Sequence, residues 1–445
     1  MDVVGIALVG GRGERARPIT VKAPGYLRSK AAMSFCGKRL IQWLIESLRL
    51  QGIRQFFVIA HGKENRYQTK TLVGFGDSFG VNIRYSRVRF DAVNTGSADA
   101  TLRMLDHWDI HAPALVFPTD SLYDFSLQEM FDQHQAREAT VTVAAMTRGP
   151  TEVAGKYGVM LADPSSLVRE FVEKPTLDKL RQHFPTPTEE DFHRLPLWTN
   201  AGMYLVDSLA VRKLGRDPEV DRMRQRRLDF GIDLLPWGVS HGMRVYAHPA
   251  NRAGDLGSVV DYLDTMVSML RGHFRSLTPL MGNPFDAGRN VWIHPETLRY
   301  HDETSGLTLE EKLEKGMVEI GPNVRLGKYV EVGPGSKLED CNVDDGVDLG
   351  EGVEIRRSAI RDGVMVGAHS TITDSYLGSM VEVQSSRRHP TILGEHVGVG
   401  DEVVIQPGVR LKGRVSVYPR LKVPAAASVP PGAELRDAAD VLRYL

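Results

Sequence analysis

Aliphatic residues recur every six positions through the C-terminal part of the chain, often with glycine after them, as in Leu326-Gly327. After two steps of six, the next step is five, as from Leu338 to Val343. This pattern places Leu326, Val343, Ile360 and Leu377 seventeen residues apart. This period is neither the 3.6 of a helix nor the 2 of an ordinary strand. It is typical of a triangular β-helix in which each face of a coil carries one inward-pointing aliphatic residue. The pattern therefore predicts a parallel β-helix built of hexapeptide repeats.

The extent of the repeat divides the chain into predicted domains. The β-helix is expected over residues 317–433, with an interruption of its register at Gln384–Thr391. Residues 271–316 are mixed in pattern and predict a connector. Residues 434–445 predict a C-terminal tail, with a short helix that covers the end of the β-helix. Residues 1–270 must then form a separate domain.

This N-terminal domain has a different pattern, in which short apolar runs alternate with amphipathic stretches. Buried strands are predicted at four runs: Val3–Val9, Phe56–Ala60, Ala114–Phe117 and Thr140–Ala145. Helices are predicted between them at Arg39–Leu50, Ser97–His107 and Leu127–Gln135. Such alternation favours an α/β fold with a Rossmann-like, mostly parallel sheet covered by helices on both faces. Ligands of such sheets bind at the carboxyl ends of the strands.

The composition is that of a soluble globular protein, with 42% hydrophobic and 25% charged residues. A formal net charge of -1 gives no reason to expect a nucleic acid or an anionic membrane as partner. No apolar run approaches the roughly 20 residues of a membrane span, and the start of the chain reads as a strand rather than a signal peptide. Cys36 and Cys341 are too few for a disulfide framework, so we expect buried, reduced thiols in a cytoplasmic protein.

A glycine-rich segment directly follows the first predicted strand. Gly10, Gly11 and Gly13 allow the backbone to approach a phosphate closely and to turn N–H groups toward it. Arg15 adds a permanently charged guanidinium for phosphate oxygens. The spacing GGxG differs from the GxGxxG of dinucleotide-binding folds. By itself the segment is compatible with either a tight structural turn or a phosphate-binding loop.

Further segments extend this motif into a family resemblance. Gly10–Thr20 (GGRGERARPIT) looks like the GGxGTRLxPLT signature of nucleotide-sugar pyrophosphorylases, and Ser29–Ile41 resembles the KPAVPFGGK-type segment that follows it there. Five more segments stand in the family's order: Asn94–Leu102, Phe171–Pro175, Thr199–Val206, Asp229–Pro236 and Asp255–Ser258. The first of these, NTGSADATL, resembles the GTADAV segment of bacterial glucose-1-phosphate adenylyltransferases, the ADP-glucose pyrophosphorylases, which also end in a left-handed β-helix. The resemblance spans essentially the whole chain.

The resemblance implies an enzyme that transfers a nucleotidyl group from ATP or GTP to a sugar 1-phosphate. It assigns catalytic roles on the phosphates to Arg15 and Lys30. The nucleotide-binding residues would be Gly10, Gly11, Gly13, Gly96, Ser97 and Ala98, and the sugar-phosphate-binding residues Gly158, Glu173, Lys174 and Asn200. Asp120 and Asp255 match positions that hold Mg²⁺ in the family, and two carboxylates with phosphate oxygens and water suit that ion.

Departures from the family pattern leave the two substrates open. Val21–Ser29 separates Thr20 from Lys30 by a longer stretch than in the adenylyltransferases. The glutamine that often reads the base upstream of the GTADAV segment is absent from Arg87–Val93. An alternative is therefore a guanylyltransferase that acts on a cyclitol phosphate such as valienol 1-phosphate, as members of this branch do in aminocyclitol biosynthesis.

Two alternatives belong to other classes of function. A non-catalytic regulatory subunit would usually lack a metal aspartate or a catalytic basic residue, and none is missing here. An acyltransferase activity of the β-helix would need a histidine base, for which His369 and His396 are available, but we expect both to be exposed loop residues. The flat faces and open end of a β-helix favour a homo-oligomer, a dimer or a tetramer.

Overall fold

The computed structural model describes residues 2–11, 13–23, 26–88, 95–302 and 305–445. The chain divides into two compact units, each of which is discontinuous in sequence. The first unit comprises residues 1–11 and 44–253, and the second comprises residues 12–43 and 254–445. The chain thus leaves the first unit directly after the pair Gly10-Gly11 and returns to it within the first long helix.

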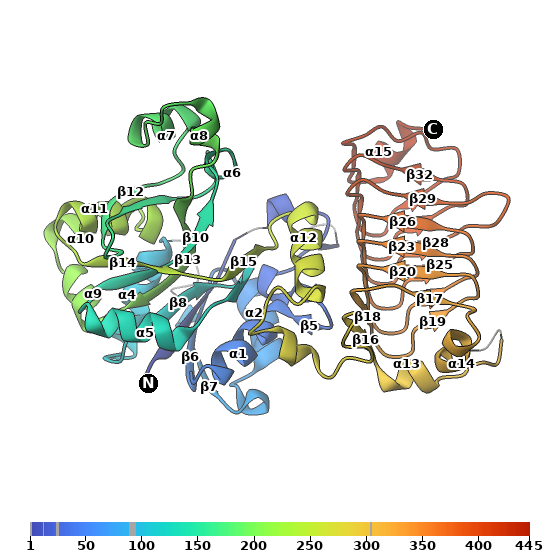
Figure 1. The fold of residues 1–445 in the computed structure, drawn as a ribbon, viewed down its shortest axis with the longest axis horizontal. Coiled ribbons are helices and arrows are strands. Elements are labelled where there is room, and N and C mark those ends of the chain that lie inside the picture. The colour runs from blue at the N-terminus through green and yellow to red at the C-terminus, as the bar shows by residue number, and fades with distance from the viewer. Residues whose placement is uncertain (1, 12, 24–25, 89–94, 303–304) are drawn as a thin grey trace. The chain divides into compact units, whose positions relative to one another are not determined.

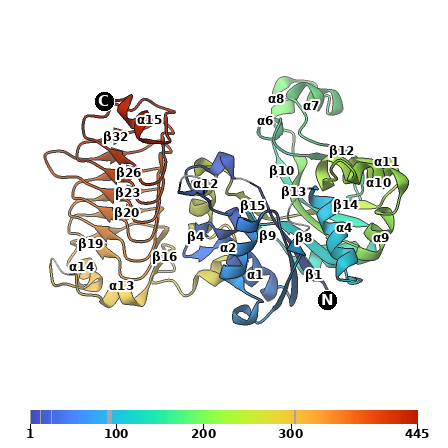
Figure 2. The ribbon, with the colours of Figure 1, turned by 180° about the vertical axis from the view of Figure 1, so that it is seen from behind.

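The first unit is built on a nine-stranded sheet with the main strand order β12-β11-β13-β8-β1-β6-β7. Its centre is parallel, because β1 (Val4–Val9) pairs with β6 (Gln55–Ala60) on one side and with β8 (Ala114–Pro118) on the other. The next strand, β7 (Asn82–Tyr85), is parallel to β6. Each end of β1, β6 and β8 lies within one residue of its predicted position. The predicted α/β fold with a parallel sheet is confirmed (Figure 2).

Beyond β8 the sheet becomes mixed, with antiparallel as well as parallel neighbours. The long strand β13 (Leu197–Val206) is antiparallel to β8 and to β10 (Val141–Arg148), which itself is parallel to β14 (Val245–Pro249). Two short strands extend the sheet further: β11 (Val159–Ala162) is antiparallel to β13, and β12 (Val168–Val172) is antiparallel to β11. Antiparallel neighbours need no crossover helix. The alternation of runs in the sequence predicted strands and helices but not this change of direction.

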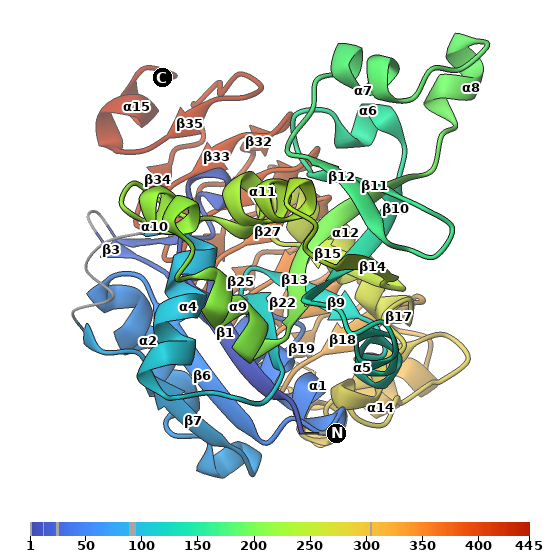
Figure 3. The same ribbon diagram turned by 90° about the vertical axis from the view of Figure 1, so that its left-hand side faces the viewer.

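Helices occupy all three predicted stretches, as α1 (Leu40–Leu50), α4 (Ser97–His107) and α5 (Leu127–Ala136). Leu102 of α4, Val211 of α9 (Ser208–Leu214) and Leu235 of α11 (Leu235–Ser240) join the apolar core on one face of the sheet. Figure 3 shows α4 and α9 side by side. Among the described residues, no helix has the length and apolar character that a membrane span requires.

In the second unit, short parallel strands form a three-faced β-helix. Leu326 of β18 (Val324–Leu326) lies beside Val343 of β21 (Asn342–Val343), and Ile360 of β24 (Ala359–Ile360) lies beside Leu377 of β27 (Tyr376–Leu377). The seventeen-residue spacing is therefore the length of one coil. These aliphatic side chains point inward and are buried in one continuous core. Figure 1 shows the coils stacked as successive rungs, which confirms the β-helix predicted from the repeat.

The interruption of the repeat is a longer turn between β28 (Glu382–Val383) and β29 (Ile392–Leu393). Helices lie at both ends of the coil stack: α13 (Pro295–Arg299) and α14 (Leu309–Glu314) at one end and α15 (Ala438–Leu442) at the other (Figures 1 and 2). Leu309 and Val441 from these helices join the core of the β-helix. The apolar ends of the stack are thus covered by the chain itself.

Cys36 and Cys341 are free and buried, as predicted. Burial raises the pKa of the Cys36 thiol to about 12, so this group stays protonated at neutral pH. His369 and His396 occupy turns of the β-helix with positive φ values of 59° and 68°. Both are half-buried rather than exposed, since their turns pack against neighbouring coils.

Candidate active site

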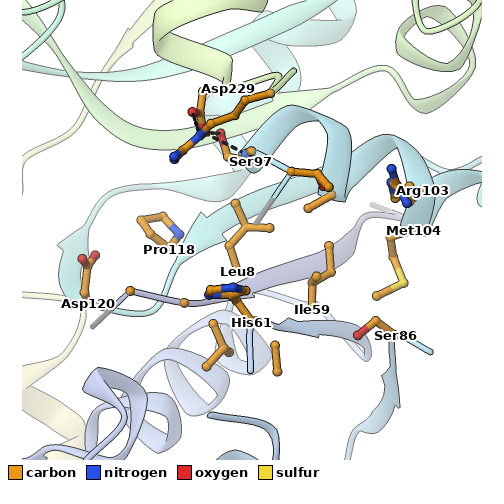
Figure 4. A pocket seen from close by; sticks show the side chains of 18 residues that line it. Leu8, Ile59, His61, Ser86, Ser97, Arg103, Met104, Pro118, Asp120 and Asp229 are labelled. Atoms are coloured by element: carbon orange, nitrogen blue, oxygen red, sulfur yellow. Dashed lines mark hydrogen bonds and ion pairs between the residues drawn. The ribbon is translucent and has the colours of Figure 1, made fainter. Parts of the chain in front are cut away.

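A cavity of about 400 Å³ lies in the first unit at the carboxyl ends of β1, β6 and β8. Figure 4 shows Asp120 at one end of this cavity and Ser86 and Met104 toward the other, with His61 between them. In open α/β sheets, ligands bind at this edge of the strands. The size of the cavity suits a small-molecule ligand.

The pair Gly10-Gly11 continues β1 into the wall of the cavity. Gly11 has a φ of +94°, a conformation that side-chain-bearing residues rarely adopt. The strand end is fixed on its other side, because the backbone N–H of His61 donates to the Val9 carbonyl over 2.7 Å. Both glycines are exposed, so their backbone is accessible to a ligand.

Asp120 stands in the tight connection between β8 and β9 (Ser121–Asp124) and lines the cavity. The preceding Thr119 is buried, and its hydroxyl donates to the Leu8 carbonyl over 3.1 Å. The threonine hydroxyl therefore fixes the position of Asp120 beside the end of β1.

The N-terminus of α4 contributes Gly96 and Ser97 to the cavity wall. Gly96 has a φ of +96°, and a Cβ there would lie 2.2 Å from the Leu228 carbonyl oxygen, so no other residue fits. That carbonyl accepts the N–H group of Ala98 over 3.0 Å, and the carboxylate of Asp229 accepts the N–H group of Ser97 over 2.9 Å. Ala98 is fully buried and is not among the residues that line the cavity.

Charged side chains form a rim around this helix end. Asp229 lines the cavity and accepts from the Arg227 guanidinium over 2.6 Å. Behind it, the fully buried carboxylate of Asp99 bridges Arg103 and Arg224, at 2.5 and 2.7 Å. A buried carboxylate held by two guanidinium groups is stable because both of its oxygens are paired. This arrangement fixes Arg103 at the cavity wall.

A second cluster of predicted residues lies directly before β11, directly after β12 and on β13. A Cβ at Gly158 would be 2.5 Å from a carboxylate oxygen of Glu173, and one at Gly231 would be 2.9 Å from the same oxygen. The Asn200 side chain donates to the Tyr204 hydroxyl over 2.9 Å and accepts from the Gly202 N–H over 2.8 Å. The structure therefore brings Gly158, Glu173 and Asn200 together.

The sheet itself supports this cluster. The register between β10 and β13 shifts between Val143 and Ala145, which bulges β13 in the stretch from Asn200 to Tyr204. Bulges of this kind redirect side chains and are common beside functional sites. Tyr204 stacks on Phe230, with 4.4 Å between the ring centroids, and burial raises the pKa of its hydroxyl. The tyrosine is thus a neutral partner that fixes the orientation of the Asn200 amide.

Glu173 and Lys174 follow β12 directly. Burial is the largest cause of a raised Glu173 pKa, Lys174 acts to lower that pKa, and Asp229 acts to raise it. The Lys174 ammonium lies 3.8 Å from the Glu173 carboxylate, and its side chain is 55% exposed. Lys174 also has a positive φ of 45°, which turns the chain sharply after the strand. A half-buried carboxylate and an exposed cation therefore stand side by side.

The remaining predicted residues belong to the second unit. Arg15 lies in a short 3₁₀ turn (Glu14–Ala16), and Lys30 begins another (Lys30–Ala32). A Cβ at Gly257 would lie 2.9 Å from a carboxylate oxygen of Asp255 and 3.3 Å from a guanidinium nitrogen of Arg15. Gly257 thus leaves the space in which Arg15 and Asp255 approach each other.

Several residues of the site gave no clear signal in the sequence. Ser86, Arg103 and His61 line the cavity but stand outside the family motifs. Asp229 opens the segment DFGIDLLP, so that motif could have identified it. The described residues contain no cluster of three or more His, Cys, Asp or Glu side chains of the kind that holds a metal ion without other ligands. Arg12 and Asn94, which belong to two of the motifs, lie outside the described residues.

Comparison with known proteins places these features in a family context. The family model described as nucleotidyl transferase matches residues 4–272, and the one described as GMPPB C-terminal domain matches residues 312–414. A glucose-1-phosphate adenylyltransferase of Trichlorobacter lovleyi is 24% identical over 82% of this chain and 90% of its own length. A mannose-1-phosphate guanyltransferase of Hypocrea jecorina is 26% identical over 96% of this chain and 98% of its own length.

Proposed function

Because the chain belongs to the nucleotidyl transferase family, we propose that it transfers a nucleotidyl group from a nucleoside triphosphate to a sugar 1-phosphate. The observation that carries this proposal is the cavity at the carboxyl ends of β1, β6 and β8, lined by Gly10-Gly11, Gly96-Ser97 and Asp120. In the proposed reaction a phosphate oxygen of the acceptor attacks the α-phosphorus of the triphosphate. The bond from that phosphorus to the bridging oxygen breaks, and pyrophosphate leaves.

The residues that handle phosphate would act by position and charge. The nucleophile is a phosphate oxygen that is largely ionised at neutral pH, so the reaction needs charge neutralisation more than a general base. The exposed backbone of Gly10 and Gly11 can face the triphosphate, and Gly13 permits the turn that leads to Arg15. In this proposal Arg15 stabilises the leaving pyrophosphate, and Lys30 contacts the α-phosphate.

The acceptor would bind at the second cluster. Glu173 and Asn200 offer hydrogen bonds to sugar hydroxyls, and the space beside Gly158 lets a ring approach the backbone. Asn200 already uses one N–H and one lone pair within the protein, which leaves one of each for a ligand. The exposed ammonium of Lys174 would pair with the phosphate of the acceptor.

Asp120 and Asp255 are the proposed ligands of Mg²⁺. Asp120 is a cavity-lining carboxylate, and Asp255 is a half-buried carboxylate near Arg15, so both fit a hard cation that takes oxygen ligands. When bound, the ion would neutralise charge on the phosphates. Asp120→Asn should lower kcat by about 10²-fold or more, with unfolding unchanged, whereas Asp132→Asn on the exposed side of α5 should have no effect. An unaltered rate for Asp120→Asn would remove this residue from the metal site.

We propose two pairs of donor and acceptor, in order of preference. Glucose 1-phosphate with ATP is the first choice, from the resemblance and from the adenylyltransferase relatives. Guanylyl transfer is the second, since the mannose-1-phosphate guanyltransferase relative covers 96% of this chain. In this second case the acceptor would be a hexose phosphate or a cyclitol phosphate such as valienol 1-phosphate.

A substrate panel tests the proposal. Purified protein is incubated with each of five nucleoside triphosphates and with several 1-phosphates, and pyrophosphate release is measured with and without Mg²⁺. Release is expected only when the ion, a triphosphate and a 1-phosphate are all present. Silence across the panel would contradict the proposal and favour a regulatory homologue. Light scattering on the same sample tests the expected dimer or tetramer.

A further inference from the structure

The stretch Val21–Ser29, which is longer than in the adenylyltransferases, is part of the second unit. We call residues 21–29 the arm. Of the described residues in it, β2 (Val21–Ala23) and β3 (Tyr26–Leu27) pair antiparallel. The Arg28 N–H closes the base of the arm by donating to the Thr20 carbonyl over 2.8 Å. The two ends of the arm are therefore held together, directly before Lys30.

Arg28 anchors the base of the arm to the β-helix. Its guanidinium forms an ion pair with Asp401, which lies in the turn between β30 (Gly398–Val399) and β31 (Val404–Ile405). Both side chains are about 10% exposed, at 11% and 10%. The second carboxylate oxygen of Asp401 accepts the Ser379 N–H over 3.1 Å, so the coil itself fixes this carboxylate. Burial acts to lower the pKa of Arg28, but Tyr376 and Asp401 outweigh it and raise that pKa.

The same base connects to the glycine-rich segment. The Arg28 guanidinium also donates to the Ile19 carbonyl over 3.2 Å. The hydroxyl of the buried Thr20 donates to the Gly13 carbonyl over 2.7 Å. Arg28 thus connects the two chain segments at the base of the arm. One of these segments leads back to Arg15, and the other leads forward to Lys30.

A second anchor holds the chain after Lys30. The Tyr262 hydroxyl of α12 (Val259–Leu270) donates to the Ser34 carbonyl over 2.7 Å. The Tyr262 ring packs edge-on against Phe35 and against Tyr376 of the β-helix, with centroid distances of 5.4 and 5.3 Å. Tyr376 is 1% exposed and also acts on Arg28. One face of the β-helix therefore supports the chain on both sides of Lys30.

We propose that the β-helix positions Lys30 for nucleotidyl transfer through the Asp401–Arg28 ion pair. Asp401 and Arg28 are positioning residues in this proposal, since neither needs to touch a substrate. The proposal rests on the role given to Lys30 in the proposed function. A displacement of a catalytic group by about 1 Å can lower a rate by about 10²-fold. Through this attachment at the base of the arm, the β-helix controls the rate.

The test begins with Asp401→Asn, which keeps the shape of the side chain and removes its charge. The matched control is Glu402→Gln, because the neighbouring Glu402 pairs with Arg420 at 3.0 Å on the exposed surface. We expect Asp401→Asn to lower kcat by about 10- to 100-fold, with the KM of the acceptor unchanged. Glu402→Gln should retain the rate of the parent protein. Equal rates for the two variants would overturn the proposal.

A double-variant cycle separates positioning from a general loss of stability. If Asp401 acts through Lys30, Asp401→Asn should cause little further loss in the Lys30→Ala background. The same fold-loss in both backgrounds would show that Asp401 acts elsewhere and would overturn the proposal. Arg28→Lys, which keeps the charge but cannot make the same forked contacts, should lower kcat less than Asp401→Asn and provides a milder variant if Asp401→Asn unfolds.

Hydrogen exchange gives a readout that needs no activity. The N–H groups of Ala32 and Met33 donate to the Ser29 and Lys30 carbonyls over 2.9 and 3.0 Å. Asp401→Asn should speed exchange at these two amides and leave the Val399 amide of the coil unchanged. Unchanged exchange at Ala32 and Met33 would refute positioning. Absence of pyrophosphate release by the parent protein would instead refute the proposed function, so the two failures can be told apart.

Discussion

The two groups of candidate site residues are supported in different ways. The proposed acceptor cluster around Glu173 and Asn200 is carried by paired strands, and the side chains of these two residues are half-buried. The segment from Gly13 to Lys30, which we propose handles the phosphates and call the phosphate-handling segment, shows in its described residues only short 3₁₀ turns and the small β2–β3 pair. It is held from outside, by the β-helix and α12. The first group is positioned by the sheet and the second by contacts distant in sequence.

This difference predicts different responses to mutation. A strand-built cluster is rigid, so a change in it should act locally, on the affinity for one substrate. A segment without a strand ladder depends on a few side-chain contacts, and hydrogen-bonded loop structure opens more easily than sheet. Changes in the phosphate-handling segment should therefore act on kcat, and those in the acceptor cluster on KM.

The largest effect is expected for Lys30→Ala. Loss of an ammonium group at the α-phosphate should lower kcat by about 10²- to 10³-fold, with a smaller effect on the KM of the acceptor. Lys22→Ala provides the matched control, because Lys22 is exposed on the arm and its ammonium lies 5.9 Å from the Tyr26 ring. Steady-state kinetics with both substrates varied give the measurement. A pure KM effect for Lys30→Ala would break the comparison.

Gly158→Ala should affect the acceptor cluster strongly but differently. The new Cβ would lie 2.5 Å from the Glu173 carboxylate and would displace it. We expect the KM of the acceptor to rise by about 10- to 100-fold, with kcat at saturation close to that of the parent protein. Gly149→Ala is the control, because its Cβ would lie 3.5 Å from its nearest neighbour. A fall in kcat alone would contradict a local role in acceptor binding.

Lys174→Ala should have a smaller effect on the same parameter. The side chain is 55% exposed, so water screens its charge and the loss of affinity for a phosphate should stay near 10-fold. Lys156→Ala, also exposed and in the same part of the chain, should leave the KM unchanged. An effect of Lys174→Ala on the triphosphate alone would refute its assignment to the acceptor.

The sequence also predicts regular parts of the molecule better than parts that depend on contacts distant in sequence. The inward positions of the β-helix are readable one by one, because a single periodic rule places Leu326, Val343 and Ile360 on the same face. The positions of the acceptor residues remain a prediction of the family motifs, and the structure brings Gly158, Glu173 and Asn200 together. The Arg28–Asp401 pair joins residues 373 positions apart, and no local pattern encodes such a contact.

Motifs also name residues without saying what their atoms do. The segment NTGSADATL predicted that Gly96, Ser97 and Ala98 would all face the nucleotide. In the structure, the backbone N–H groups of Ser97 and Ala98 bond to Asp229 and Leu228. The acceptors of these bonds lie at Leu228 and Asp229, far from α4 in the sequence, so the α4 segment alone could not predict them. In the proposed function, a contact of Ser97 or Ala98 with the nucleotide would therefore use groups other than these two N–H donors.

The smallest expected effect concerns stability rather than rate. The Glu173 pKa is raised in the folded protein, chiefly by burial, so the ionised carboxylate costs stability. The contribution of Glu173 to the free energy of unfolding is most favourable below the unfolded-state pKa of about 4.3. This contribution is lost as the pH rises through the folded-state pKa. Glu173→Gln removes this loss, and it should stabilise the protein by less than about 1 kcal/mol at pH above the folded pKa.

Urea unfolding of the parent protein and of Glu173→Gln, at a pH near neutrality and again below the carboxyl range, measures this difference. The gain should vanish at the lower pH, where both side chains are neutral, while the affinity for the acceptor should fall at neutral pH. Glu64→Gln on the exposed side of α2 (Lys63–Val73) should change neither quantity. A stabilisation that persists at low pH would mean that shape rather than charge sets the cost. In that case, the charge of Glu173 would not destabilise the acceptor cluster. The cluster would then differ from the phosphate-handling segment only in how its residues are held in place, by paired strands rather than by side-chain contacts.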